Sequence, residues 1–314
     1  MGENNENQGR QSVGLDKQVD KLEALRASKE GRRAQGTLRG QRARGSAEKL
    51  LTRTTSGAIY AVLTIGCLFL GPFATALLIM SMAWLCCSEF FRICRMGGRG
   101  PNEIFGLAVA LLFPLAAYGR GVSGMAVVLM LFLVAIAAWY VATPRANIAD
   151  VAVTVFGPVY TSFSFSAIVL IRAFDKGPQG AFLALGVMLC IWVSDSFAYV
   201  VGSKLGKHKL APRISPNKSW EGFWAGLVGS VLTWVVIALV GVDGLAVWHA
   251  LPLGLVVGVV GVVGDLFESR IKRGVGVKDS GNLMPGHGGL LDRSDSLLFG
   301  SVAAYLLLLI GGIL

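Results

Sequence analysis

Long apolar runs separated by short polar breaks fill the chain from about residue 53 to its end. A helix needs about 20 apolar residues to cross the hydrocarbon core of a bilayer. By this measure the pattern predicts nine helices, at residues 53–71, 73–95, 104–119, 122–143, 148–173, 179–202, 220–241, 245–270 and 294–313. We therefore predict an all-α polytopic membrane protein with about nine transmembrane helices and a polar site that faces the cytoplasm.

Glycine and proline mark the breaks between the first helices. Gly71 and Pro72 predict a tight turn, and a loop is expected from Gly97 to Pro101. Residues 119–121 predict another turn, and Pro144 ends the fourth helix.

Composition agrees with a bilayer setting and separates a tail from the rest. Hydrophobic residues make up 54% of the chain and charged residues 15%, and the mean hydropathy is +0.61. A soluble globule of 314 residues with a normal surface would not reach this balance. Residues 1–50 hold no apolar run, so we expect no secretory signal peptide there. We predict a polar cytoplasmic tail at 1–50 and a transmembrane domain at 51–314.

The tail has two interpretations that the sequence leaves open. Four apolar residues recur at helical spacing: Leu15, Val19, Leu22 and Leu25. They permit a short amphipathic helix at the lipid surface, whereas the polar composition of the tail is typical of a disordered segment.

Lysine and arginine predict the orientation. If the tail is cytoplasmic, all 29 of these residues except Arg120, Arg172 and Lys176 fall in the tail or at the cytoplasmic ends and loops. The two long polar loops, 203–219 and 271–293, then face the cytoplasm, and the predicted location is the cell (inner) membrane. Anionic lipid headgroups and the topology account for the net charge of +10, so we expect no nucleic-acid partner.

Candidate chemistry is concentrated just before the last apolar run, in KDSGNLMPGHGGLLDRSD at residues 278–295. A polar, glycine-rich loop between two runs of membrane length is not explained by packing. It indicates a ligand with phosphate or metal character. His287 is the histidine that lies among these candidate residues.

The predicted eighth helix adds a second group of polar side chains. Three glycines recur on one face of it: Gly254, Gly258 and Gly261. Small residues at this spacing let a neighbouring helix approach closely. Asp265 continues that face, and Glu268 and Ser269 follow three and four residues later. Asp265 either has a function or pairs with Arg270 or Lys272.

The predicted sixth helix carries Asp195, which lies about 10 Å below the helix end at 1.5 Å per residue. This depth is unfavourable for a carboxylate in lipid. Asp195 therefore has a function, forms an internal ion pair with Lys204 or Lys218, or does both.

The loop between the sixth and seventh helices holds a candidate phosphate site. Ser215 followed by Pro216 is typical of an N-cap and a first helical residue, which would place Lys218 in the first turn. A lysine among free backbone N–H groups would bind phosphate. A solvated basic loop that obeys the positive-inside pattern is the alternative.

Two stretches together resemble one known family. The string from Ser269 to Asp295 is similar to the signature of phosphatidate cytidylyltransferase, also called CDP-diacylglycerol synthase, and residues 194–226 resemble that family's other marked stretch. Met284 and Ser294 depart from the usual residues, but neither change removes a polar group. The tail lies outside the resemblance.

The resemblance implies that CTP and phosphatidic acid react to give CDP-diacylglycerol and pyrophosphate in phospholipid biosynthesis. It implies Mg²⁺ as cofactor, with a second cation left open. The implied metal ligands are Asp265 and Asp292, with Asp195 and Ser269 completing the shell, and the implied catalytic residues are Asp265, Asp292, Lys218 and His287. The implied substrate-binding residues are Ser215, Lys218, Lys272, Arg273, Lys278, Asp279, Gly288, Gly289 and Arg293.

Three other functions are alternatives to this one. In a cation-coupled transporter, Asp195 and Asp265 would form a cation path, but the basic and glycine residues in the cytoplasmic loops favour a nucleotide. The sequence pattern of a CDP-alcohol phosphotransferase is absent. A cytidylyltransferase that acts on another lipid phosphate stays open, as does a homodimer.

Overall fold

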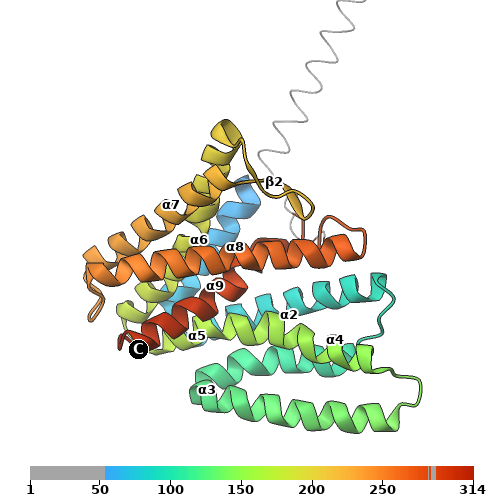
Figure 1. The fold of residues 1–314 in the computed structure, drawn as a ribbon. Helices are drawn as coiled ribbons and strands as arrows, with labels where there is room; N and C mark the ends of the chain where they lie inside the picture. The colour runs from blue at the N-terminus through green and yellow to red at the C-terminus, as the bar shows by residue number, and fades with distance from the viewer. Residues whose placement is uncertain (1–53, 282, 284–287) are drawn as a thin grey trace, which may run out of the picture. The chain divides into compact units, whose positions relative to one another are not determined.

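Helices make up almost all of the regular structure in the computed structural model, which describes residues 54–281, 283 and 288–314 (Figure 1). The elements are a helix at Thr54–Leu70, α2 (Pro72–Met96), α3 (Glu103–Ala142), α4 (Ile148–Pro158), the π-helix η1 (Val159–Phe163), α5 (Ser164–Ala173), α6 (Pro178–Leu205), β1 (Lys209–Ala211), β2 (Ser215–Ser219), α7 (Trp220–Leu239), the 3₁₀-helix η2 (Val247–His249), α8 (Ala250–Gly274) and α9 (Leu291–Ile310). The predicted tail at 1–50 lies outside the described residues.

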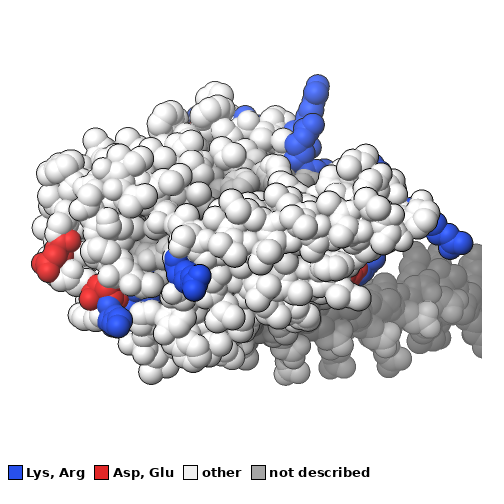
Figure 2. All heavy atoms as spheres, turned by 90° about the horizontal axis from the view of Figure 1, so that it is seen from below, with Lys and Arg blue, Asp and Glu red and all other residues white. Residues whose placement is uncertain are grey.

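Seven helical segments within the described residues are long and apolar enough to cross a membrane. They are Pro72–Met96, Glu103–Ala142, Ile148–Ala173, Pro178–Leu205, Trp220–Leu239, Val247–Gly274 and Leu291–Ile310, and the helix Thr54–Leu70 is apolar but shorter. One face of the molecule presents a broad neutral surface, with its few charged side chains mostly near the ends (Figure 2). The prediction of an all-α polytopic membrane protein is confirmed.

The two helices predicted at 104–119 and 122–143 are the two legs of α3. The helix departs from helical geometry at Gly121, where φ is 61° and ψ is −147°. Glycine adopts this left-handed φ without the penalty that a Cβ imposes. The chain doubles back there, and the two legs run side by side (Figure 1).

Glycines bring α8 against its neighbours, as their spacing predicted. A Cβ on Gly254 would collide with the backbone of Val231 on α7, and one on Gly264 would collide with the carbonyl oxygen of Asp295 on α9. Ser230 of α7 donates a hydrogen bond from its hydroxyl to the carbonyl of Gly254 at 2.6 Å. This close approach places the polar C-terminal end of α8 next to the polar N-terminal end of α9.

The predicted helix start at Ser215 is wrong. Ser215 and Pro216 belong to strand β2, which pairs antiparallel with β1. Helix α7 begins at Trp220, as the apolar run predicted, and its N-cap is Ser219, whose hydroxyl accepts the N–H of Gly222 at 3.2 Å. Proline has no backbone N–H to donate, and an edge strand tolerates this because one of its two sides is not hydrogen-bonded to a neighbouring strand. Lys218 therefore lies in the strand, before the helix begins.

Candidate active site

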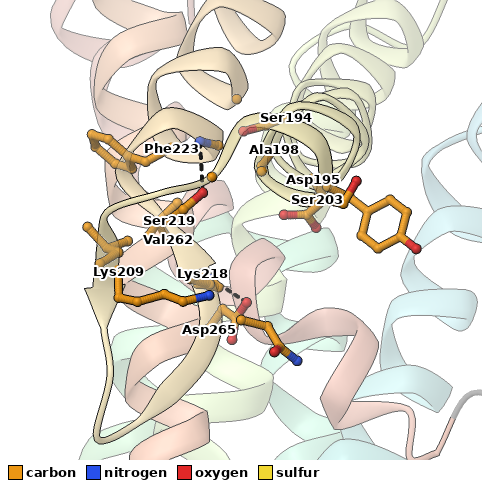
Figure 3. Close-up of a pocket in the computed structure, with 17 residues that line it drawn as sticks. Ser194, Asp195, Ala198, Ser203, Lys209, Lys218, Ser219, Phe223, Val262 and Asp265 are labelled. Carbon is orange, nitrogen blue, oxygen red and sulfur yellow. Dashed lines mark hydrogen bonds and ion pairs between the residues drawn. The ribbon is translucent and has the colours of Figure 1, made fainter.

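A cavity of about 510 Å³ lies between α6, α7, α8 and the β1–β2 hairpin. Lys218 reaches into it from β2 and points toward Asp265 of α8 (Figure 3). The Lys218 Nζ lies 2.5 Å from Asp265 Oδ2, and about a quarter of each side chain is exposed. Asp265 thus contacts Lys218, and the alternative in which it pairs with Arg270 or Lys272 is not what the structure shows.

A second cavity, of about 860 Å³, adjoins the first and collects residues from distant parts of the chain. The two cavities share Asp195, Asn217 and Asp265. The predicted site residues that line the second cavity are Asp195, Ser215, Asp265, Lys272, Arg273, Lys278, Asp279, Asp292 and Arg293. Most of the predicted site is therefore brought together in one place.

The carboxylates around the second cavity have different surroundings. Asp195 is exposed where it lines both cavities. Asp265 uses its other oxygen, Oδ1, to accept the hydroxyl of Ser269 at 3.2 Å. Asp295 is buried and also lines the second cavity. Asp195 and Asp265 thus line both cavities, whereas Asp295 lines the second alone.

Asp292 already has a full set of partners. Its Oδ1 accepts the ammonium of Lys272 at 2.5 Å. The N–H of Ser280 donates to both of its oxygens at 3.1 and 2.9 Å, and the N–H of Gly289 donates to Oδ2 at 2.8 Å. The carboxylate therefore ties the start of α9 to the preceding loop.

Lys272 lies between two carboxylates. The side chain is 8% exposed, and its ammonium contacts Glu268 on its own helix and Asp292 at the start of α9. The Glu268 carboxylate is almost completely buried. The predicted binding of a phosphate by Lys272 would have to compete with these two contacts.

Oxygen ligands for a divalent cation are present, although not as a preformed cluster. Among the described residues, no group of three or more histidine, cysteine, aspartate or glutamate side chains is close enough to hold a metal ion. Mg²⁺ commonly takes only one or two protein carboxylates and completes its shell with water and substrate phosphates. Asp195 and Asp265, which both line the two cavities, suit such a cation.

The loop glycines have roles within the protein. Gly288 has a φ of +90°, and a Cβ there would lie 2.9 Å from Asp292 Oδ2. Gly289 is buried, and its N–H already donates to Asp292. Their predicted contact with substrate phosphate stays a prediction. His287 lies outside the described residues.

Sequence reasoning missed two residues of α2. Glu89 is buried and accepts hydrogen bonds from the Ser280 hydroxyl at 2.8 Å and from the N–H groups of Leu290 and Leu291 at 3.1 and 2.9 Å. Arg92 donates from Nη2 to the carbonyl of Ser280 at 2.6 Å. The available signal for Glu89 was a carboxylate inside an apolar run. Arg92 gives no such signal, because a basic residue at a predicted cytoplasmic helix end is explained by topology alone.

Comparison with known proteins places this site in a family. The model of the cytidylyltransferase family matches residues 51–310. The chain belongs to the cytidylyltransferase family. The resemblance that the two sequence motifs indicated, and the nucleotidyltransferase class that it implied, are thereby confirmed.

Individual relatives of this cytidylyltransferase carry a more specific name. A phosphatidate cytidylyltransferase of Bacillus subtilis (strain 168) is 32% identical over 261 residues, which are 82% of this chain and 96% of that relative. A phosphatidate cytidylyltransferase of Staphylococcus saprophyticus is 41% identical over 138 residues, 44% of this chain and 53% of the relative. One of Staphylococcus aureus (strain COL) is 43% identical over 126 residues, 40% of this chain and 48% of the relative. The match thus spans about half the length of the staphylococcal relatives and nearly all of the Bacillus one.

Proposed function

We propose that this cytidylyltransferase transfers CMP from CTP to phosphatidic acid, giving CDP-diacylglycerol and pyrophosphate. The observation that carries the proposal is the meeting of two cavities at Asp195, Asn217 and Asp265. Two bulky anionic substrates must be brought together, and two joined cavities provide room for both. The relatives named phosphatidate cytidylyltransferase support the same reaction.

Charge suggests how the substrates are bound. The second cavity presents the cationic side chains of Arg273, Lys278 and Arg293, which suit the triphosphate of CTP. The first cavity presents Lys209 and Lys218 beside the apolar side chains of Phe223 and others on α6 and α7, which suits a lipid phosphate. A cationic group thus faces each substrate, and this lowers the repulsion between the two anions.

The reaction needs positioning and charge neutralisation more than proton transfer. An oxygen of the lipid phosphate forms a bond to the α-phosphorus of CTP. The bond between that phosphorus and the oxygen bridging to the β-phosphate breaks, and the electron pair leaves with pyrophosphate. The lipid phosphate is already ionised at pH 7, so no general base is required.

The cofactor in this proposal is Mg²⁺, which when bound neutralises charge on the phosphates during the transfer. Asp265 is the first of its ligands. Asp195 is a better second ligand than Asp292, because Asp292 already accepts Lys272 and two backbone N–H groups. Ser269, which donates to Asp265, then orients that carboxylate. A second cation is not required by these contacts.

We further propose nine membrane crossings, with the N-terminus and both cavities on the cytoplasmic side of the cell membrane. Counting the two legs of α3 separately and adding the helix Thr54–Leu70 gives nine segments. The concentration of lysine and arginine in the hairpin and in the loop before α9 supports this orientation.

The deciding experiment measures pyrophosphate release by purified protein in detergent micelles. Release should require CTP, phosphatidic acid and Mg²⁺ together, and EDTA should abolish it. No release from folded protein under these conditions would refute the proposal. A panel of other lipid phosphates, offered at equal concentration, tests the alternative acceptor directly: faster turnover with one of them would reassign the substrate.

A further inference from the structure

Ser280, in the segment between α8 and α9, is hydrogen-bonded to both α2 and α9. This residue is fully buried, and each of its three polar groups has a partner on a different element or helix turn. Its N–H donates to Asp292 of α9, its hydroxyl donates to Glu89 of α2 at 2.8 Å, and its carbonyl accepts Arg92 of α2 at 2.6 Å. Ser280 is therefore held from two sides, with α2 supplying two of the three contacts.

The Glu89 side chain also caps the N-terminus of α9. The residue that precedes this helix, Leu290, has no side chain able to cap it. The N–H groups of Leu290 and Leu291, which a helix start leaves without an intrahelical partner, donate to the two oxygens of Glu89. A carboxylate at a helix N-terminus is also favoured by the helix dipole. A side chain from α2 thus fixes where α9 begins.

Two glycines of the loop make room for this carboxylate. A Cβ on Gly281 would collide with the Glu89 carboxylate, and a Cβ on Gly289 would collide with both Glu89 and the Ser280 hydroxyl. By contrast, Gly274 at the end of α8 has open space around the position of a Cβ. The glycines at 281 and 289 are therefore required by Glu89, independently of any substrate.

We propose that Glu89 and Arg92 are positioning residues for the transfer reaction. By holding Ser280, they fix the loop that carries Lys278 and Asp279 and the first turn of α9 that carries Asp292. All three of these side chains line the second cavity. The inference rests on the proposed function, because it takes the second cavity, which these residues line, as the place where CTP binds. Displacement of a reacting group by about 1 Å can cost on the order of 100-fold in rate.

The first test is Glu89→Gln. The amide keeps the size of the side chain, but its NH₂ group must replace one carboxylate oxygen and therefore face a backbone N–H, either that of Leu290 or that of Leu291. The kcat of pyrophosphate release should fall by about 10- to 100-fold. The KM for phosphatidic acid should stay within about threefold, because the first cavity does not include this loop. Unchanged kcat in Glu89→Gln would overturn the proposal.

A matched control lies on the same helix. Arg95 is half exposed and pairs with Glu103 at the start of α3. Arg95→Gln should therefore keep the wild-type kcat, whereas Arg92→Gln should lower it. Equal losses in both arginine variants would show a general effect of charge removal on α2 and would contradict a positioning role.

A double-mutant cycle distinguishes positioning from a merely structural contribution. Glu89 and Ser280 share one hydrogen bond, so Ser280→Ala should lower kcat several-fold in the wild type and have little further effect in Glu89→Gln. Effects that multiply would contradict the shared role. Gly289→Ala should resemble Glu89→Gln in its kinetics, whereas Gly274→Ala should resemble the wild type.

A readout without catalysis separates this inference from the proposed function. Hydrogen exchange at the N–H groups of Leu290 and Leu291 should be at least about tenfold faster in Glu89→Gln than in the wild type, because their acceptor is weakened. If the wild type releases no pyrophosphate but exchange accelerates as expected, the function is wrong and the attachment of the loop stands. Unchanged exchange would refute the attachment itself.

Discussion

Lys272→Met tests whether the cation between Glu268 and Asp292 is required to hold α8 and α9 together. Methionine keeps much of the length of the side chain and removes its charge. Lys272 is buried, its ammonium contacts both carboxylates, and the Glu268 side chain is only 1% exposed. The substitution therefore leaves two carboxylates without their cation in a poorly hydrated place.

The expected loss follows from that burial. Removing one partner of a buried ion pair typically costs about 3–5 kcal/mol, compared with about 1 kcal/mol or less at an exposed site. Asp292 keeps the N–H groups of Ser280 and Gly289, so most of the cost falls on Glu268. A loss of about 3 kcal/mol corresponds to a shift of more than about 100-fold in the folding equilibrium.

The assay is reversible unfolding in mixed micelles, followed by tryptophan fluorescence. Lys272→Met should unfold at lower denaturant than the wild type, and Glu268→Gln in the same chain should restore part of the lost free energy by removing one uncompensated charge. Lys176→Met, at an exposed position between α5 and α6, is the control and should change stability little. A loss below about 1 kcal/mol in Lys272→Met, or no recovery in the double variant, would refute the reasoning.

Other predictions concern catalysis and topology. Asp265→Asn should lower kcat to less than about one hundredth of the wild type in folded protein, as measured by pyrophosphate release. Lys218→Gln should weaken substrate use in the same assay, and Lys218→Arg should not fully rescue it, because the guanidinium needs different room beside Asp265. A cysteine at Lys207 should react with an impermeant label only from the cytoplasmic side, and one at Lys176 only from the other. Deletion of residues 2–47 should leave specific activity within about threefold, because the family match begins at residue 51.

The helices could be predicted from the sequence because each depends on a local pattern. Apolar length and glycine or proline breaks placed α2, the two legs of α3 and α6 within a few residues of their observed bounds. The glycine face of α8 was also predicted, because a repeat of small residues is itself the signal for close packing. Local patterns were less reliable at Ser215, where the sequence is compatible with both a helix start and an edge strand. Pairing with β1 decides between them.

The partners within the site could not be predicted, since they depend on contacts between distant residues. Ser280 and Glu89 are 191 positions apart, so nothing near either one indicates the other. The sequence indicates a metal ligand at Asp292. It does not show the four hydrogen bonds of this carboxylate, because they form only when α8, α9 and the loop between them are assembled. The sequence thus predicts most of the residues that line the cavities, but not which of their side chains already form hydrogen bonds or ion pairs within the protein.

Because Lys218 and Asp265 form an ion pair, a charged ligand that enters the cavities must displace one of the two partners. A phosphate that approaches Lys218 must compete with a carboxylate for the same ammonium, and a cation that approaches Asp265 must compete with that ammonium. Either ligand alone would leave one charge of the broken pair uncompensated, whereas an anion and a cation that arrive together supply both replacements. Binding at this place is therefore an exchange of partners, and it favours a nucleotide and its counter-ion as a joint ligand over either one separately.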